Sequence, residues 1–354
     1  GGMRLGIAVV YMVSERNERL LDLHLSQIEK NTTLPYTIYA AVNRLLPQFR
    51  EKLEANPRVK ICPCETYVPG SGLLKHERER AAVKGTVHQD CKYEHSWYLE
   101  QLIRMAVDDG VTHIALFHVD SFPVRSGWDQ ELISQLSGRC VLAGAVRDAK
   151  KDCKPLTAGM LFSREFYLTY QPRLLPTEEE MGSSDYARYR QACPHCGDSG
   201  AGYGFRMFME GLTWHPLVRS NLGGRHALFG TVHGDMIFHL TTAAVIDQQN
   251  MVGWTVRPSQ RKGLVGAMAR VGKILLPGML RREVRSRASK HLTRRCQADD
   301  RQQWEREREL LLEDPERYLA DLRTGAQSER PSASCCGAVE IPRPARQPER
   351  TVVD

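Results

Sequence analysis

The sequence predicts an α/β fold in which helices flank a mixed sheet. Over the first two-thirds of the chain, short runs rich in β-branched residues alternate with apolar residues at helical spacing, which is the pattern of strands joined by crossover helices. The run 112–117 is almost wholly apolar, as expected of a central strand that is covered on both faces. With 354 residues, the chain is long enough for one large domain with additional segments.

The expected elements follow one another in alternating order. We expect strands at 5–11, 36–42 and 59–62, with helices around 21–28 and 46–53 between them. A helix that carries Leu99, Leu102 and Ala106 on one face leads to the central strand, and Gly110 is placed to end it. Beyond the central strand, the same criteria predict strands at 140–146, 159–162 and 213–218 and a helix at 203–210.

The composition is that of a soluble globular protein. Hydrophobic residues make up 42% and charged residues 26% of the chain, close to the averages for folded domains. The best membrane-span candidate, near Ile274, is interrupted by Pro277 and falls short of roughly 18 apolar residues. Gly1 and Gly2 before Met3 resemble a cleavage scar, and no secretory signal follows. We therefore expect a cytoplasmic protein whose ten cysteines are reduced thiols or metal ligands.

The composition changes near residue 257 and predicts a division into three parts. Lysine and arginine recur through 257–295, where Glu283 is the only acid. We expect a main domain at 1–256, a basic helical appendage at 257–326 and a disordered tail at 327–354, because the tail is rich in Ser, Pro and charge. The appendage suits either an anionic membrane surface, here the inner face of the membrane, or plain solvation. Aromatic residues for base stacking are scarce in it, which disfavours nucleic acid.

The central strand leads directly into the most informative motif of the chain. Phe117 is followed by His118, Val119, Asp120 and Ser121. Polar residues at the carboxyl end of a central strand mark the place where open α/β sheets bind ligands. The motif therefore predicts a binding site at this edge of the sheet.

The segment 114–128 combines this strand with Asp120, Pro123 and the pair Gly127-Trp128. It resembles the metal-binding region of glycosyltransferases with a GT-A fold, in particular glycosyltransferase family 2, and the likeness in element order extends over about 4–245. The resemblance implies a Rossmann-like nucleotide-diphospho-sugar transferase domain. It also implies a metal-dependent enzyme that moves a sugar from a nucleotide-diphosphate donor to an acceptor hydroxyl with inversion.

On this resemblance, Asp120 corresponds to the last Asp of an Asp-x-Asp-like motif. It would hold Mn²⁺ or Mg²⁺ beside the diphosphate, where oxygen ligands suit a hard cation. His118 stands where the first Asp commonly stands, which leaves its own contact with metal or ribose open. A simple turn after a strand is the alternative role for Asp120, because Asp is common in turns.

Two later segments complete the implied site. Asp198 precedes a helical run, where the resembling enzymes carry the base that deprotonates the acceptor hydroxyl; an ordinary N-cap is the alternative. His239, and second to it His233, follow that helix, where many of these transferases supply a histidine to the metal or diphosphate. A neutral imidazole is a competent metal ligand, and a hydrogen-bonded structural histidine is the alternative for both.

The early strand ends supply candidate nucleotide contacts. The resemblance places Glu15 and Asn43 after the first two strands and His95 at the start of the helix before the central strand. All three would lie on the nucleotide side, and solvated turn residues are the alternative. Separately, Cys193 and Cys196 have the spacing of a zinc-binding pair. One pair is half a site, so a structural zinc ion and free loop thiols both remain open.

The resemblance thus implies a glycosyltransferase with a UDP-, GDP- or TDP-linked donor. A glycan, a lipid-linked molecule or another hydroxyl compound would be its acceptor. A nucleotidyltransferase is the nearest alternative enzyme, but the residues after the first strand, 13–17, are not the Gly-rich basic loop that it would need. A non-catalytic module that binds nucleotide or glycan is the alternative from another class, because His118 replaces an acidic motif residue.

Overall fold

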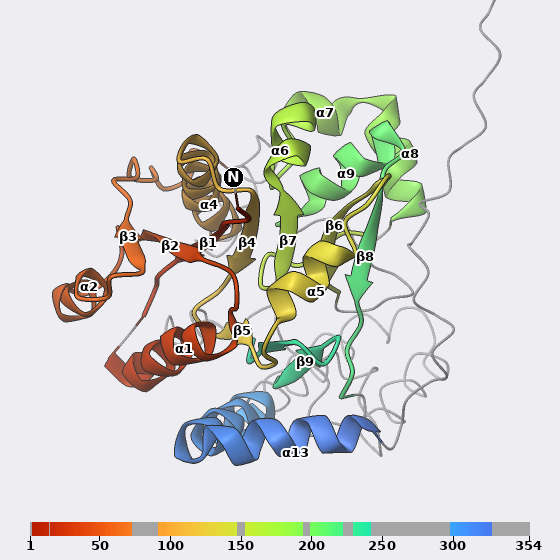
Figure 1. Cartoon of the computed structure of the whole chain (residues 1–354). Helices are drawn as coiled ribbons and strands as arrows, with labels where there is room; N and C mark the ends of the chain where they lie inside the picture. The colour runs from red at the N-terminus through yellow and green to blue at the C-terminus, as the bar shows by residue number, and fades with distance from the viewer. Residues whose placement is uncertain are drawn as a thin grey trace, which may run out of the picture.

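The structure is a computed structural model that describes residues 2–13, 15–72, 91–146, 153–193, 199–221, 229–241 and 298–327 (Figure 1). Asp198, Cys196 and the basic run 257–295 lie outside these ranges. The role of Asp198 as base and that of Cys196 as zinc ligand therefore stay predictions. The same holds for most of the basic appendage and for the tail.

A seven-stranded sheet with strand order β3-β2-β1-β4-β7-β6-β8 forms the centre of the described chain. Only β7 (Met160–Ser163) runs antiparallel to its neighbours, β4 and β6. The other strands are β1 (Leu5–Val10), β2 (Tyr36–Ala41), β3 (Val59–Ile61), β4 (His113–Phe117), β6 (Cys140–Ala145) and β8 (Thr213–Leu217). The predicted mixed α/β sheet is therefore confirmed, and each strand of this sheet ends within a residue of its predicted bounds.

The order of the strands changes direction between β1 and β4. The chain builds β1, β2 and β3 outward and then places β4 on the opposite side of β1. Because β1 and β4 are parallel, with Val9 paired to Phe117, their carboxyl ends lie together at one edge. Open α/β sheets bind ligands in the crevice at such a switch point. The edge that carries the His118–Ser121 motif is therefore also the topological switch point.

Helices cover both faces of the sheet and divide the apolar interior into two main clusters. Side chains of α1, α2 and α5 belong to one cluster, and those of α4, α6 and α9 belong to the other. Their bounds are α1 (Glu18–Asn31), α2 (Pro47–Glu54), α4 (Cys91–Asp108), α5 (Trp128–Ser134), α6 (Arg164–Tyr170) and α9 (Ala201–Glu210). The short elements η1 (Glu15–Asn17), α7 (Glu178–Gly182) and α8 (Ser184–Ala192) connect them.

The Gly127-Trp128 pair has a structural role at the start of α5. Gly127 adopts a left-handed conformation with φ 75°, which a Cβ atom disfavours. Trp128 is 1% exposed and packs against Phe117, with 5.3 Å between ring centroids. Its indole N–H donates to Thr32 Oγ1 at 3.2 Å. The pair therefore fixes α5 against the last residue of β4.

A second, antiparallel sheet continues from the end of β4. Its order is β5-β10-β9, formed by β5 (Ser121–Pro123), β10 (Ile237–His239) and β9 (Thr231–His233). β10 pairs with β5 so that His239 lies opposite Ser121. Strands of three residues are too short to show an alternating pattern, which is why the sequence did not predict them.

The C-terminal helices pack into the main body. Residues 298–313 form one helix and α13 (Pro315–Gln327) the next; in Figure 1 they are blue and lie beside α1 and β9. Trp304, Leu311 and Tyr318 are at most 4% exposed and share an apolar cluster with β1 and α1. The described part of the predicted appendage is therefore integrated into the core. Its boundary at 257 lies outside the described residues.

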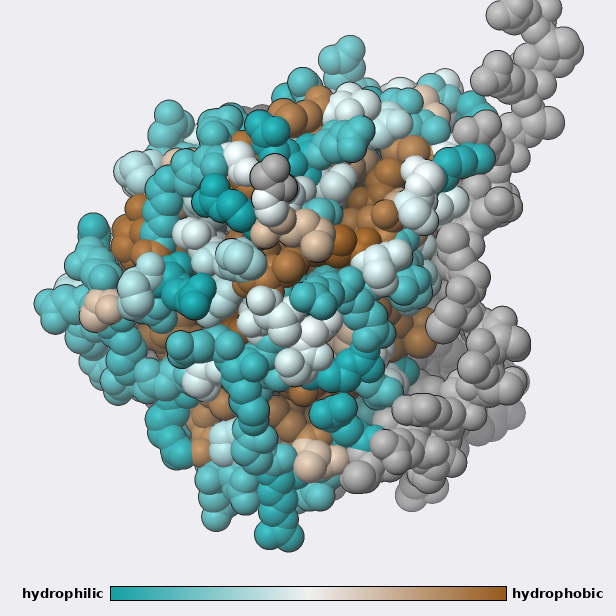
Figure 2. All heavy atoms as spheres, in the orientation of Figure 1, coloured by the Kyte–Doolittle hydropathy of each residue, from teal (hydrophilic) through white to brown (hydrophobic). Residues whose placement is uncertain are grey.

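Among the residues that the structure describes, no helix is both long and apolar enough to span a bilayer. The face seen in Figure 1 is mainly hydrophilic, with smaller hydrophobic areas between the polar ones (Figure 2). Most large apolar side chains of the described elements instead lie in the two interior clusters.

A carboxylate is enclosed between α4 and the loop before α7. Glu100 Oε1 accepts from the Leu174 amide at 2.5 Å. Burial raises the pKa of Glu100 to about 7, although the Leu174 amide and the guanidinium groups of Arg104 and Arg173 act in the opposite direction. The folded state therefore keeps a proton that the unfolded chain releases at lower pH.

We expect Glu100→Gln to remove a pH-dependent loss of stability. Because the folded-state pKa of Glu100 lies above the unfolded value, the wild type loses stability as pH rises from about 4.5 to 7. Gln keeps an acceptor for the Leu174 amide but cannot ionise. Relative to the wild type, the variant should gain about 3 kcal/mol of unfolding free energy between about pH 4.5 and 8. Urea denaturation at both pH values measures this gain.

The exposed Glu165 of α6 provides the control, since Glu165→Gln removes a carboxylate that is in contact with water. The difference between Glu100→Gln and the wild type should change more with pH than that between Glu165→Gln and the wild type. An equal change in both variants, or none in Glu100→Gln, would contradict the assigned proton.

Candidate metal centre

The chain makes a tight turn where β4 ends. The Ser121 amide donates to the His118 carbonyl at 3.0 Å, and Ser121 Oγ accepts from the His118 amide at 2.8 Å. Such reciprocal bonds are typical of a turn stabilised by a serine side chain. They hold His118 and Asp120 at the switch point and lead β4 directly into β5.

Three side chains meet at this turn, those of His118, Asp120 and His239. Asp120 Oδ1 lies 3.9 Å from His118 Nδ1 and 3.6 Å from His239 Nε2, and one ligand atom from each residue lies within 4.8 Å of the others. Ligands bound at about 2.0–2.2 Å from one cation are roughly 3–4 Å apart. The Asp120 and His239 side chains are 6% and 9% exposed and that of His118 is 31% exposed. The group is therefore buried on one side and accessible on the other.

His239 reaches this group through the small sheet. The antiparallel pairing of β10 with β5 places it opposite Ser121. The Leu240 amide donates to the Asp120 carbonyl at 2.9 Å, which extends the pairing by one residue. Main-chain hydrogen bonds thus bring together a turn after β4 and a segment far along the chain.

Each histidine of the group is oriented by a threonine on its other ring nitrogen. His118 Nε2 lies 3.1 Å from Thr157 Oγ1, and its Nδ1 faces Asp120. His239 Nδ1 lies 3.4 Å from Thr241 Oγ1, and its Nε2 faces Asp120. Metal-binding histidines commonly engage a second group in this way, which fixes the tautomer and the ring orientation. The donor set is therefore already oriented toward one point.

The imidazole of His118 is held in its neutral form. Burial lowers the pKa of His118, and His95 and His239 act in the same direction, whereas Asp120 opposes them. The His95 ring meets His118 edge-on, with 4.7 Å between centroids. A neutral imidazole has a lone pair to offer a metal, so a cation can bind here without first displacing a proton.

Two imidazole nitrogens and one carboxylate oxygen favour a particular class of cation. Mg²⁺ prefers oxygen ligands in near-octahedral geometry, whereas imidazole suits first-row transition metals. The donor set of His118, Asp120 and His239 therefore fits a divalent transition metal.

The other sequence-predicted site residues that the structure describes are His95, which contacts this group, and three residues that make other contacts. His233 is 2% exposed on β9, and its Nε2 lies 3.0 Å from Thr231 Oγ1. Asn43 is exposed and donates to the Cys64 carbonyl at 3.0 Å, so it braces the loop after β3. Glu15 is exposed in η1. Metal binding by His233 and nucleotide contacts by Glu15 and Asn43 stay predictions, whereas His95 contacts the group through His118.

Cys193 forms a disulfide with Cys153. The expectation that Cys193 is a zinc ligand or a free loop thiol does not hold here, because a sulfur atom in a disulfide has no thiolate to offer. The two cysteines are 40 positions apart, and no local pattern marks them as a pair. Free cysteines within the described ranges include Cys62, Cys64 and Cys140.

A buried histidine hydrogen-bonds to the turn that carries His118 and Asp120. His24 of α1 is fully buried; its Nδ1 lies 3.0 Å from the Ser121 carbonyl and its Nε2 lies 3.3 Å from the Tyr11 hydroxyl. Burial lowers the pKa of His24 to about 4, so the neutral ring donates to the carbonyl and accepts from Tyr11. His24, Thr157 and Thr241 were not among the site residues predicted from the sequence. For His24 the available signal was a polar residue on the apolar face of a predicted helix.

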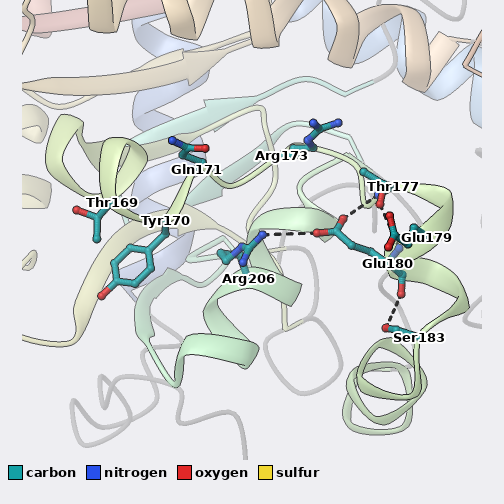
Figure 3. A pocket seen from close by; sticks show the side chains of 9 residues that line it. All are labelled: Thr169, Tyr170, Gln171, Arg173, Thr177, Glu179, Glu180, Ser183 and Arg206. Carbon is teal, nitrogen blue, oxygen red and sulfur yellow. Dashed lines mark hydrogen bonds and ion pairs between the residues drawn. The ribbon is translucent and has the colours of Figure 1, made fainter.

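A separate polar recess lies between α6, α7 and α9 (Figure 3). It has a volume of about 620 Å³, and Tyr170, Arg173 and Arg206 are among its lining residues. Glu180 accepts from Thr177 in the capping box of α7 and lies 3.6 Å from Arg206. These polar groups stabilise helix ends and each other, so they do not by themselves define a ligand.

We expect Asp120→Asn and His239→Ala to weaken transition-metal binding by roughly 100-fold or more, because each removes a direct ligand. His233→Gln tests the second predicted histidine ligand: because His233 Nε2 already lies 3.0 Å from Thr231 Oγ1, we expect a smaller loss of affinity than for His239→Ala. Isothermal titration of the full chain with Mn²⁺, Co²⁺ and Zn²⁺ measures all three variants.

Asp108→Asn, at an exposed position in the last turn of α4, is the matched control for losing a carboxylate. It should bind metal as the wild type does. Wild-type affinity in Asp120→Asn would show that the carboxylate is not a ligand.

No protein-family model matches the chain, and no curated protein matches it. Solved structures that resemble it include mouse xyloside xylosyltransferase 1 in its apo form. That comparison has 10% sequence identity and a TM-score of 0.27, and it covers 59% of this chain and 82% of the other. A superposition at this level carries no argument about function, which must come from the site itself.

Proposed function

We propose that the chain is a metal-dependent glycosyltransferase that moves a sugar from a nucleotide-diphosphate donor to an acceptor hydroxyl. The observation that carries the proposal is the group of His118, Asp120 and His239 at the carboxyl end of β4. It combines a cation site with the switch point of an α/β sheet. A nucleotide diphosphate is a ligand that needs both.

The topology supports nucleotide binding beside the metal group. β1 and β4 are adjacent and parallel, and the crevice between their carboxyl ends is where doubly wound sheets bind nucleotides. Two buried residues stand next to this edge: the Tyr11 hydroxyl bonds to His24, and His24 bonds to the Ser121 carbonyl. The donor would therefore lie in this crevice, with its diphosphate toward Asp120.

The residues present fit a bound cation, which His118, Asp120 and His239 would hold. When bound, the cation supplies Lewis acidity, which lowers the cost of the negative charge that develops on the departing diphosphate. Thr157 and Thr241 keep the two imidazoles aimed at that point. Burial on the Asp120 side keeps water away from the carboxylate, which strengthens its attraction for the cation.

Asp198 stays our candidate for the base that removes the acceptor proton, with inversion at the sugar carbon. Its neighbour Ser199 supports the position, because Ser199 Oγ lies 3.3 Å from Ser96 Oγ on α4. His95, next to Ser96, contacts His118. The start of α9 is therefore linked to the metal group through the first turns of α4.

The wider expectations also stay proposals. We retain a transferase domain at 1–256, and an anionic membrane surface as a partner of the basic run 257–295. The cytoplasmic location has an observation against it, because reducing compartments keep thiols reduced and Cys153 is bonded to Cys193. The disulfide favours an oxidising compartment.

The test is donor hydrolysis by the full chain. We expect nucleoside diphosphate to be released from at least one member of a panel of UDP-, GDP- and TDP-sugars with Mn²⁺, and Asp120→Ala to lower the rate by roughly 100-fold or more. Chelation of the metal should have the same effect. Asp108→Asn should keep the wild-type rate.

Other outcomes would support the alternative functions. Release of pyrophosphate from a nucleoside triphosphate would indicate a nucleotidyltransferase, and failure to bind any nucleotide would remove the enzyme proposal. Two histidines and one carboxylate also bind non-haem iron, so Fe²⁺ belongs in the metal panel. Tight binding of Fe²⁺ without nucleotide binding would point to oxygen chemistry instead.

A further inference from the structure

The segment that follows His239 is held by the C-terminal helices. Trp304, in the helix 298–313, is fully buried, and its indole N–H donates to the Thr241 carbonyl at 2.8 Å. Thr241 Oγ1 lies 3.4 Å from His239 Nδ1. A chain of two hydrogen bonds therefore joins a helix near the end of the described chain to a candidate metal ligand.

Thr241 occupies a conformation that needs external support. Its φ is 75°, in the left-handed region that β-branched residues rarely adopt. Such strain persists only where the surrounding structure holds it in place. The Trp304 bond to the Thr241 carbonyl is a contact that does so, because it fixes the peptide group on the carboxyl side of the strained residue.

A second contact, from α13, holds the β9–β10 hairpin that carries His239. The Tyr318 ring of α13 meets the Phe238 ring edge-on, with 6.1 Å between centroids. Tyr318 donates its hydroxyl to Glu307 Oε2 at 2.6 Å, so the ring is held in position. Gly230 lies directly under this hydroxyl, and its amide donates to the Leu240 carbonyl at 3.3 Å.

The two helices are in turn fixed to α1. Lys30 Nζ of α1 lies 2.6 Å from Glu316 Oε1, and Arg308 donates at 3.3 Å to Oδ1 of Asn17, the N-cap residue that precedes α1. Helix α1 also carries His24, which bonds to the Ser121 carbonyl. The C-terminal helices and the turn at Asp120 therefore both contact α1. Because the helices also hold the segment with His239, the positions of His239 and Asp120 are coupled.

We propose that the C-terminal helices at 298–327 position the third metal ligand, with Trp304 as a positioning residue that acts on His239 through Thr241. The inference rests on the proposed metal site but not on sugar transfer. Its consequence is that metal affinity depends on a tryptophan that does not touch the metal.

The test compares Trp304→Phe with the wild-type full chain. Phe keeps an aromatic ring in the cavity but removes the N–H that bonds to Thr241. We expect the affinity for Co²⁺ to fall roughly 10-fold, as for other residues that orient a metal ligand, and the visible absorption spectrum of bound Co²⁺ to change. An unchanged affinity and spectrum would overturn the proposal.

Trp214→Phe is the matched control. Trp214 of β8 is also fully buried, and its indole N–H has no acceptor among the described residues. The variant should lower thermal stability and leave Co²⁺ affinity and spectrum unchanged. If Trp214→Phe altered them as much as Trp304→Phe, a general loosening of the core would replace the positioning role.

A second variant, Thr241→Val, keeps the test decisive even if Trp304→Phe fails to fold. Val has nearly the shape of Thr and keeps the carbonyl that Trp304 binds, but it removes the hydroxyl beside His239. We expect the same loss of affinity and the same spectral change; wild-type values would contradict the proposal. Absence of metal binding in the wild type would instead refute the metal site itself.

Discussion

The pairing of β10 with β5 is the contact on which the candidate metal centre depends. β5 follows Asp120 directly, and the register of the pair decides where His239 stands. A shift by one residue would turn its side chain to the opposite face of the sheet. Phe122 and Phe238, paired in the same ladder with 5.1 Å between ring centroids, oppose such a shift because both are fully buried.

The large sheet was predictable because its strands carry their own signal. Strands such as β1 and β4 are runs of apolar residues long enough to show burial on both faces, and the site residues His118 and Asp120 follow β4 directly. His239 was preferred to His233 on the resemblance, but no local structural signal in the sequence separates the two. Both lie on three-residue strands of the small sheet, and only the register between distant segments separates them. The Cys153–Cys193 bond was unpredictable for the same reason.

The histidines near the turn show how one environment supports two roles. Burial lowers the pKa of both His24 and His118, so both rings are neutral. His24 uses both nitrogens, one on the Ser121 carbonyl and one on Tyr11, and has none to offer a cation. His118 uses one on Thr157 and directs the other at Asp120. The two histidines therefore differ in how many ring nitrogens are hydrogen-bonded. This number, more than burial, separates the structural histidine from the candidate ligand.

The parts of the centre are spread along most of the chain. β1 and β4 come first, β10 follows at 237–239, and the helix with Trp304 comes after residue 297. Contacts between segments that are distant in sequence form late, because closing the long loops between them costs entropy. The three candidate ligands can therefore come together only after the ribosome has delivered His239, and Trp304 follows later still. On the proposed function, a cation would enter a largely folded protein instead of templating a nascent one.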